Sequence, residues 1–103
     1  MKKIIDGKVY NTETAECVAN ENKSLNNFYS TSEALYRTKS GNWFLLGESS
    51  AGGKYGRSRG NTLSGGEDIR ALTPEQVIRW AEDAEINDAE KTRIAELLNL
   101  PEA

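Results

Sequence analysis

The most constraining feature of this chain is an abrupt change of pattern at Thr73. The segment Thr73-Pro74-Glu75-Gln76 places a threonine three residues before a glutamine, with a proline between them, as in a helix capping box. Apolar residues then recur at helical spacing, at Val77, Trp80, Ala81 and Ala84. Upstream of Thr73 the apolar residues form short β-prone runs. The chain is therefore predicted to be α+β, with its strands first and its helices last.

A second helix is predicted directly after the first. Asn87-Asp88-Ala89-Glu90 is another capping box, and an apolar face follows at Ile94, Leu97 and Leu98. Asn99 suits a left-handed helix cap, and Pro101 prevents the helix from continuing. We expect two helices within residues 73–100.

The first 72 residues carry two hairpin signals. Asp6-Gly7 lies between Ile4-Ile5 and Val9-Tyr10, and this dipeptide favours a tight turn. The runs 33–39 and 43–47 flank the turn residues 40–42, and the second run is apolar on both faces, as in a central strand. Residues 69–72 form a further strand, and 20–24 are polar enough to predict a loop. We therefore expect an antiparallel sheet of about four to five strands within one domain, residues 1–103.

Residues 52–66 differ in kind, because six of the fifteen are glycine. We expect a Gly-rich basic loop here. Its cations Lys54, Arg57 and Arg59, together with Tyr55, suit a phosphate backbone or a stacked base. Arg37 and Lys39 beside the second hairpin turn would support such a contact. The alternative is a solvated loop whose charges only maintain solubility.

The net charge of −3 conceals two opposed halves. Residues 1–66 carry nine basic and six acidic side chains, a net charge of +3. Residues 67–103 carry four basic and ten acidic side chains, a net charge of −6. The overall charge therefore does not argue against a nucleic-acid partner for the basic half.

The residue inventory argues against most enzymes. The chain has no histidine and a single cysteine, so one chain cannot form a Ser-His-Asp triad, a histidine metal site or an internal disulfide. Cys17 is expected to be a small buried side chain. No spacing of carboxylates indicates a catalytic pair. We expect no catalytic residue, metal, cofactor or small-molecule substrate. No apolar stretch reaches the length of a membrane span, so a cytoplasmic protein is expected.

Two segments resemble a known group. Residues 2–16, KKIIDGKVYNTETAE, and the run from Leu35 to Phe44 resemble small proteins from mobile elements of Firmicutes. Some members of this group are anti-CRISPR proteins, which inhibit the RNA-guided DNA nuclease of type II-A systems. The resemblance extends over most of residues 2–80, and Ser49-Ser50-Ala51 departs from the Gly-Gly that is common in the group.

The resemblance implies a phage- or plasmid-borne inhibitor that acts in the host bacterial cytoplasm. It implies three possible modes: binding the nuclease, binding its guide RNA, or lowering guide-RNA levels. The resemblance implies no catalytic residue in this chain. We expect the partner to be contacted by Arg37, Lys39, Lys54, Tyr55, Arg57 and Arg59. The alternatives are a small nucleic-acid-binding regulator of a mobile element and an RNA-cleaving enzyme.

Overall fold

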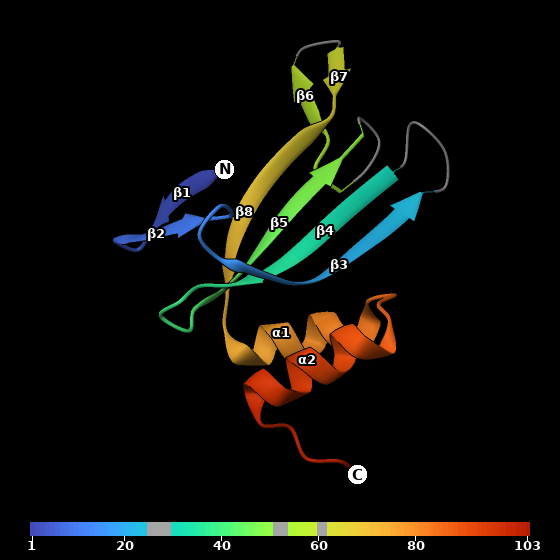
Figure 1. Ribbon diagram of the computed structural model, residues 1–103. Helices are drawn as coiled ribbons and strands as arrows, with labels where there is room; N and C mark the ends of the chain where they lie inside the picture. Colours follow the sequence, from blue (N-terminus) through green and yellow to red (C-terminus); the bar gives the residue numbers. More distant parts are fainter. Residues whose placement is uncertain (25–29, 51–53, 60–61) are drawn as a thin grey trace.

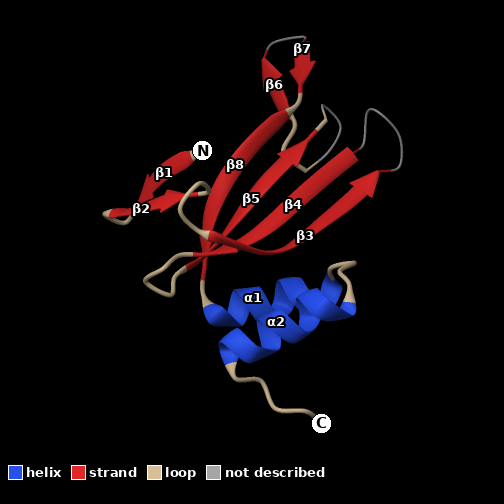
Figure 2. Cartoon of the chain, viewed as in Figure 1, coloured by secondary structure: helices blue, strands red, loops and turns tan. Residues whose placement is uncertain are grey.

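The protein is built in three layers, with two helices and a hairpin on opposite faces of a sheet (Figures 1 and 2). The computed structural model describes residues 1–24, 30–50, 54–59 and 62–103. The strands precede both helices, and the predicted α+β class is confirmed.

The middle layer is an antiparallel sheet of four strands. These are β3 (Glu16–Ser24), β4 (Ser30–Arg37), β5 (Trp43–Ser49) and β8 (Gly66–Leu72), in the spatial order β3-β4-β5-β8. As predicted, the run after the second hairpin turn is central, because β5 pairs with both β4 and β8. Trp43, Phe44 and Leu45 are consecutive and all buried, which is possible only in a strand covered on both faces.

The hairpin layer consists of β1 (Lys2–Ile5) and β2 (Lys8–Asn11). Asp6 and Gly7 between them both have positive φ, at 50° and 75°, so the predicted tight Asp-Gly turn is confirmed. Tyr10 turns inward against Phe44, with the ring centroids 5.5 Å apart. The hairpin thereby covers the sheet face that carries Phe44 and Ile69.

The helical layer follows the predicted boundaries closely. Helix α1 spans Pro74–Asp83 and α2 spans Asp88–Leu98. Both capping boxes are formed, with Thr73 and Asn87 as the N-caps. Asn99 has φ 54° and ψ 44°, the left-handed conformation expected of it.

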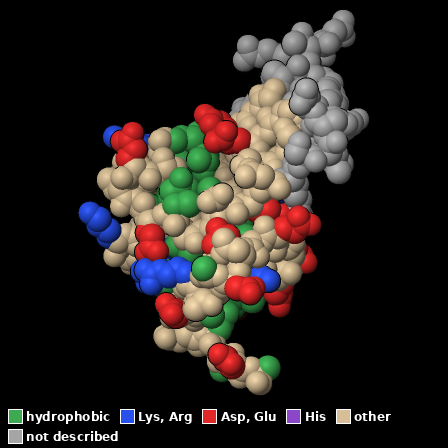
Figure 3. Space-filling model, turned by 45° about the vertical axis from the view of Figure 1, so that its right-hand side comes forward, with side chains coloured by type: hydrophobic (Ala, Val, Ile, Leu, Met, Phe, Trp, Pro, Cys, Tyr) green, Lys and Arg blue, Asp and Glu red, His purple; other side chains and the backbone are tan. Residues whose placement is uncertain are grey.

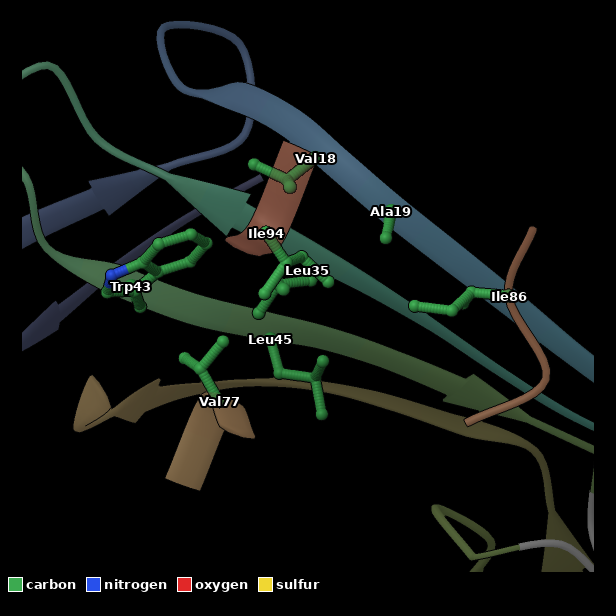
Figure 4. Close-up of a cluster of buried hydrophobic side chains, with 8 residues drawn as sticks. All are labelled: Val18, Ala19, Leu35, Trp43, Leu45, Val77, Ile86 and Ile94. Carbon is green, nitrogen blue, oxygen red and sulfur yellow. The ribbon is translucent and has the colours of Figure 1, made fainter. Parts of the chain in front are cut away.

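The larger core lies between the sheet and the helices. Figure 4 shows its side chains converging from β3, β4, β5, both helices and the segment that joins the helices. Leu35 and Leu45 face each other across β4 and β5, and Val77 and Ile94 close the cluster from the helices. All four are exposed by 2% or less, so this cluster supplies much of the apolar burial that stabilises the fold.

Three expectations are corrected by the structure. Residues 20–24 are not a loop but the second half of β3, where they pair with β4. Polar residues are acceptable there because β3 is an edge strand with Asn20 and Asn22 exposed. Cys17 is exposed, because the register shift between Cys17 and Ala19 turns Val18 and Ala19 inward instead.

The third correction concerns the Gly-rich segment 52–66. It is not loop throughout, because β6 (Arg57–Arg59) pairs antiparallel with β7 (Thr62–Ser64) and Gly66 already begins β8. This short hairpin is a separate two-stranded sheet that lies beyond the ends of β5 and β8 (Figure 1). Backbone pairing needs no apolar residues, so the high glycine content of the segment predicted a loop where the structure has a hairpin. Residues 52–53 and 60–61 of the expected loop lie outside the described residues.

Candidate functional site

A buried carboxylate, that of Glu33, organises the end of the sheet nearest the β6–β7 hairpin. Its oxygen Oε2 accepts hydrogen bonds from the Tyr55 hydroxyl at 2.5 Å and from the Lys54 ammonium at 3.0 Å. Its other oxygen, Oε1, accepts from the indole N–H of Trp80 at 3.3 Å. Residue 33 is 9% exposed, so three donors from two other parts of the chain compensate a charge that burial would penalise.

The strand register explains why these groups meet. Glu33 is opposite Gly47 in the β4–β5 ladder, and the Tyr55 ring lies where a side chain at position 47 would be. An added Cβ there would overlap with the Tyr55 ring. The backbone N–H of Tyr55 donates to Ser49 Oγ at 2.7 Å, which fixes the segment against β5. A glycine in a central strand is thus explained by close approach of another side chain.

The charge of the Glu33 carboxylate is compensated by donors of the protein itself. Burial alone would raise the pKa of Glu33, but the hydrogen bonds from Tyr55, Lys54 and Trp80 together with the Lys54 charge hold it below its ordinary value. Burial and the hydrogen bond to Glu33 raise the pKa of Tyr55 well above its usual range. The carboxylate therefore stays ionised and bonded to internal donors, an arrangement suited to anchoring the segment that leads into β6.

The six residues singled out from the sequence fall into two groups. Lys54 and Tyr55 lie at one end of the sheet, and Arg57 and Arg59 belong to β6, which continues from them. Lys54 is half-exposed despite its ion pair with Glu33. Tyr55 is held by Glu33 and is partly buried.

Arg37 and Lys39 form the second group, at the opposite end of β4. Arg37 is six residues from Thr31, which accepts from the Lys54 backbone, so the groups are about 20 Å apart along the strand. The Arg37 guanidinium lies over the Trp43 ring, 5.8 Å from its centroid, and Lys39 is exposed in the β4–β5 turn. The structure therefore does not bring all six residues into one patch.

The helical layer is predominantly acidic. Figure 3 shows acidic side chains spread over and beside the helices. Arg93 of α2 is paired outside this layer, because its guanidinium donates to both oxygens of Glu16 on β3, at 2.8 and 2.9 Å. The positive charge read from the sequence lies instead in the β1–β2 hairpin, at Lys2, Lys3 and Lys8, and in residues 54–59.

The outer face of the β1–β2 hairpin is apolar and exposed. Ile4 and Val9 are opposite each other in the ladder and are 73% and 60% exposed. A cross-strand pair of β-branched side chains normally gains its stabilisation from being covered. This pair is a candidate contact for a protein partner.

Sequence reasoning missed Glu33 as the organising residue and missed Arg70 and Arg79, which line a cleft between β8 and α1. For Glu33 the available signal was its alternation with Leu35, because both residues belong to the helix-facing side of β4. Arg70 stands between Ile69 and Ala71 in β8, which places it on the face opposite Ile69.

No grouping of three or more cysteine, aspartate or glutamate side chains suited to a metal ion occurs in the described part of the chain. Within the same residues, neither helix is long and apolar enough to cross a membrane. Comparisons with protein-family models, curated proteins and solved structures find no significant match to this chain.

Proposed function

We propose that this protein is a non-enzymatic anti-CRISPR inhibitor that binds the type II-A RNA-guided nuclease or its guide RNA in the host bacterial cytoplasm. The observation that carries the proposal is the contact between the two segments that resemble the mobile-element group. Tyr10 of the opening segment packs on Phe44 of the second, and Lys8 Nζ donates to Asn42 Oδ1 at 3.4 Å. The resemblance therefore covers one continuous piece of the fold and is not two unrelated stretches.

The contact surface proposed for RNA is the end of the sheet that bears the β6–β7 hairpin. Arg57 and Arg59 are in β6, and Lys54 lies just before it. Lys54 uses one of its three N–H donors on Glu33 and retains two for a partner. Because Glu33 anchors Tyr55 and Lys54, a ligand would bind a segment whose base is already ordered, which lowers the entropic cost of binding.

The decisive experiment is a pull-down of tagged protein from cells that express a type II-A nuclease and its guide, with and without RNase. It compares wild type with Arg57→Glu/Arg59→Glu and with a control of equal charge change, Lys2→Glu/Lys91→Glu. We expect the first variant to lose inhibition of DNA cleavage and the control to retain it, with melting temperatures near wild type. Full inhibition by Arg57→Glu/Arg59→Glu would show that these residues are not the contact.

The same experiment separates the modes of inhibition. A complex that RNase dissolves indicates guide-RNA binding. A complex that survives RNase and is lost in Ile4→Asp/Val9→Asp indicates a protein contact through the exposed hairpin pair. Guide-RNA levels measured in the same cells reveal the third mode, in which no stable complex forms. Absence of any complex together with unchanged guide-RNA levels and unimpaired DNA cleavage would refute the proposed function.

The concentration of basic residues in 54–59 also favours a second candidate, a small nucleic-acid-binding regulator of a mobile element. Such a protein would bind naked RNA or DNA without the nuclease, and its affinity would fall steeply with salt concentration. A gel shift on naked nucleic acid at two salt concentrations discriminates between the candidates. Incubation of guide RNA with pure protein, with and without magnesium, tests the RNA-cleaving alternative directly.

A further inference from the structure

The cleft between β8 and α1 is lined by donors and apolar groups, and no acidic side chain lines it. Leu45, Leu72 and Trp80 form its apolar part, and Arg70, Gln76 and Arg79 form its polar part. Its volume is about 260 Å³. Small-molecule pockets usually measure about 300–1,000 Å³, so this cleft suits one small ligand or the end of a larger one.

The Arg70 guanidinium interacts with the Tyr55 hydroxyl, but neither Arg70 nor Arg79 has a carboxylate partner among the described residues. Four other cations of the described residues do have carboxylate partners: Lys3, Lys54, Lys91 and Arg93. Among the described residues, neither Arg70 nor Arg79 has a carboxylate within the 4.0 Å of an ion pair. Even Glu75, one helical turn before Arg79, does not form one. The cleft therefore has an uncompensated positive charge.

Two further side chains in the cleft are held in place by partners outside it. Gln76 Oε1 accepts the backbone N–H of Thr73 at 2.8 Å in the capping box, so the amide of Gln76 has its N–H₂ group left to donate. The indole N–H of Trp80 is bonded to Glu33, which fixes the plane of the ring. The Tyr55 hydroxyl lies close enough to Arg70 for the guanidinium charge to act on it.

We propose that this cleft binds the terminal phosphate of a nucleotide, with Arg70, Arg79 and the Gln76 amide on the phosphate oxygens. The attached sugar or base then lies against the fixed indole of Trp80 and the side chain of Leu72. The source is either a free mononucleotide or the phosphorylated end of an RNA strand. This site uses neither Arg57 nor Arg59, and it does not depend on the proposed inhibition of the nuclease.

A terminal phosphate matches this donor set better than a carboxylate does. A single guanidinium already satisfies both oxygens of a carboxylate, as Arg93 does for Glu16. A terminal phosphate has three acceptor oxygens and a charge of about −1.5 to −2 at neutral pH, which calls for two guanidinium groups and a further donor. Inorganic phosphate alone has no apolar group that could contact the apolar side of the cleft.

The test is a titration followed by ¹H–¹⁵N NMR, with the indole N–H signal of Trp80 as the reporter. The probes are AMP, adenosine, inorganic phosphate, a short RNA with a 5′-phosphate, the same RNA with a 5′-hydroxyl, and an oligo-glutamate peptide. We expect AMP or the 5′-phosphorylated RNA to shift the Trp80 signal with saturation, and adenosine and 5′-hydroxyl RNA to bind at least about tenfold more weakly. Saturation by AMP alone identifies a free nucleotide as the ligand, and saturation by the 5′-phosphorylated RNA alone identifies an RNA end.

The variants compared are Arg70→Ala/Arg79→Ala and the control Lys2→Ala/Lys91→Ala, which removes the same charge elsewhere. The first should weaken AMP binding by about tenfold or more, and the control should leave it within about twofold. A urea denaturation midpoint of the free variant close to that of wild type shows that the fold is retained. Equal binding of adenosine and AMP, preferential binding of oligo-glutamate, no saturable binding by AMP or 5′-phosphorylated RNA, or undiminished binding by Arg70→Ala/Arg79→Ala would each overturn the proposal. If the nuclease is inhibited normally while AMP and 5′-phosphorylated RNA fail to bind, this proposal fails and the proposed function stands.

Discussion

The ring of Tyr55 occupies the space that a side chain at Gly47 would need. The two residues belong to different segments. Glu33, which is opposite Gly47 in the β4–β5 ladder, accepts a hydrogen bond from the Tyr55 hydroxyl. One glycine in a central strand thus allows the segment before β6 to be fastened to the sheet. Trp80 extends the same network to α1, so the segment before β6, the sheet and the helical layer share one polar cluster.

Replacement of Gly47 by alanine should displace Tyr55 and leave the Glu33 carboxylate with one donor fewer. We expect a loss of about 2–4 kcal/mol in the free energy of unfolding, measured by urea denaturation. The double variant Gly47→Ala/Tyr55→Ala should cost clearly less than the sum of the two single variants, because the second substitution restores the space. Strict additivity would contradict the packing relationship.

The Glu33 network should make the free energy of unfolding depend on pH in the acidic range. The pKa of Glu33 is lowered in the folded state, so the stabilisation is fully present above the unfolded value of about 4.5 and is lost as the pH falls through the lower folded value. Urea denaturation of wild type and Glu33→Gln at neutral pH and at steps below pH 4.5 tests this. The difference in stability between the two proteins should shrink on acidification, and a difference that is constant with pH would contradict it.

The Tyr55 hydroxyl can be tested separately, because phenylalanine keeps the ring over Gly47. Tyr55→Phe should reduce the free energy of unfolding by about 1.5–3 kcal/mol at neutral pH, the range for a hydrogen bond to a charged group. In the Glu33→Gln background the same substitution should cost less. An equal cost in both backgrounds would show that the hydroxyl acts through another partner.

The Glu16–Arg93 pair joins α2 to the edge strand β3, and it is half-exposed. The Arg93 guanidinium holds the pKa of Glu16 below its ordinary value. Arg93→Gln should therefore lower the melting temperature slightly at low salt, and the difference from wild type should shrink in concentrated salt because screening weakens the exposed pair. A salt-independent difference would indicate lost packing instead of lost charge.

Phe44 supports the face of the sheet that the β1–β2 hairpin covers. Its ring stacks on Tyr36 with the centroids 5.0 Å apart and meets Tyr10 edge-on. Phe44→Ala should cost about 3–5 kcal/mol in the free energy of unfolding, a large share of the total stability of a small domain. Val9→Ala, on the exposed side of the same hairpin, should change stability by no more than about 0.5 kcal/mol. Comparable losses of stability in Phe44→Ala and Val9→Ala would mean that the β1–β2 hairpin does not cover the sheet face that carries Phe44.

Features set by neighbouring residues could be predicted from the sequence. The Asp6-Gly7 turn, both capping boxes and the Asn99 cap depend on contacts within about four residues, and each was located correctly. The central position of β5 followed from its continuous apolar run. The second half of β3 and the β6–β7 hairpin were missed, because their residues pair through the backbone and have no apolar alternation.

The candidate site was less predictable, because its members are far apart in the chain. Glu33 meets Tyr55 at a separation of 22 residues and Trp80 at a separation of 47. The sequence identified the basic residues by type, and the placement of Arg37 and Lys39 at the other end of the sheet from Lys54 depends on strand register. Arg70 and Arg79 were not predicted as site residues, because nothing local distinguishes an arginine with a carboxylate partner from one without.

Amino-acid order alone thus accounts for the strand-then-helix plan, the turns, the caps and the division into a basic and an acidic half, since each depends on composition or on residues close in the chain. Tertiary structure decided which carboxylate is buried, which cations are neutralised and which remain available in a cleft. The physical reason is that pairing and burial depend on distances in space, and these exist only once β4, β5, β8 and α1 have been brought into register.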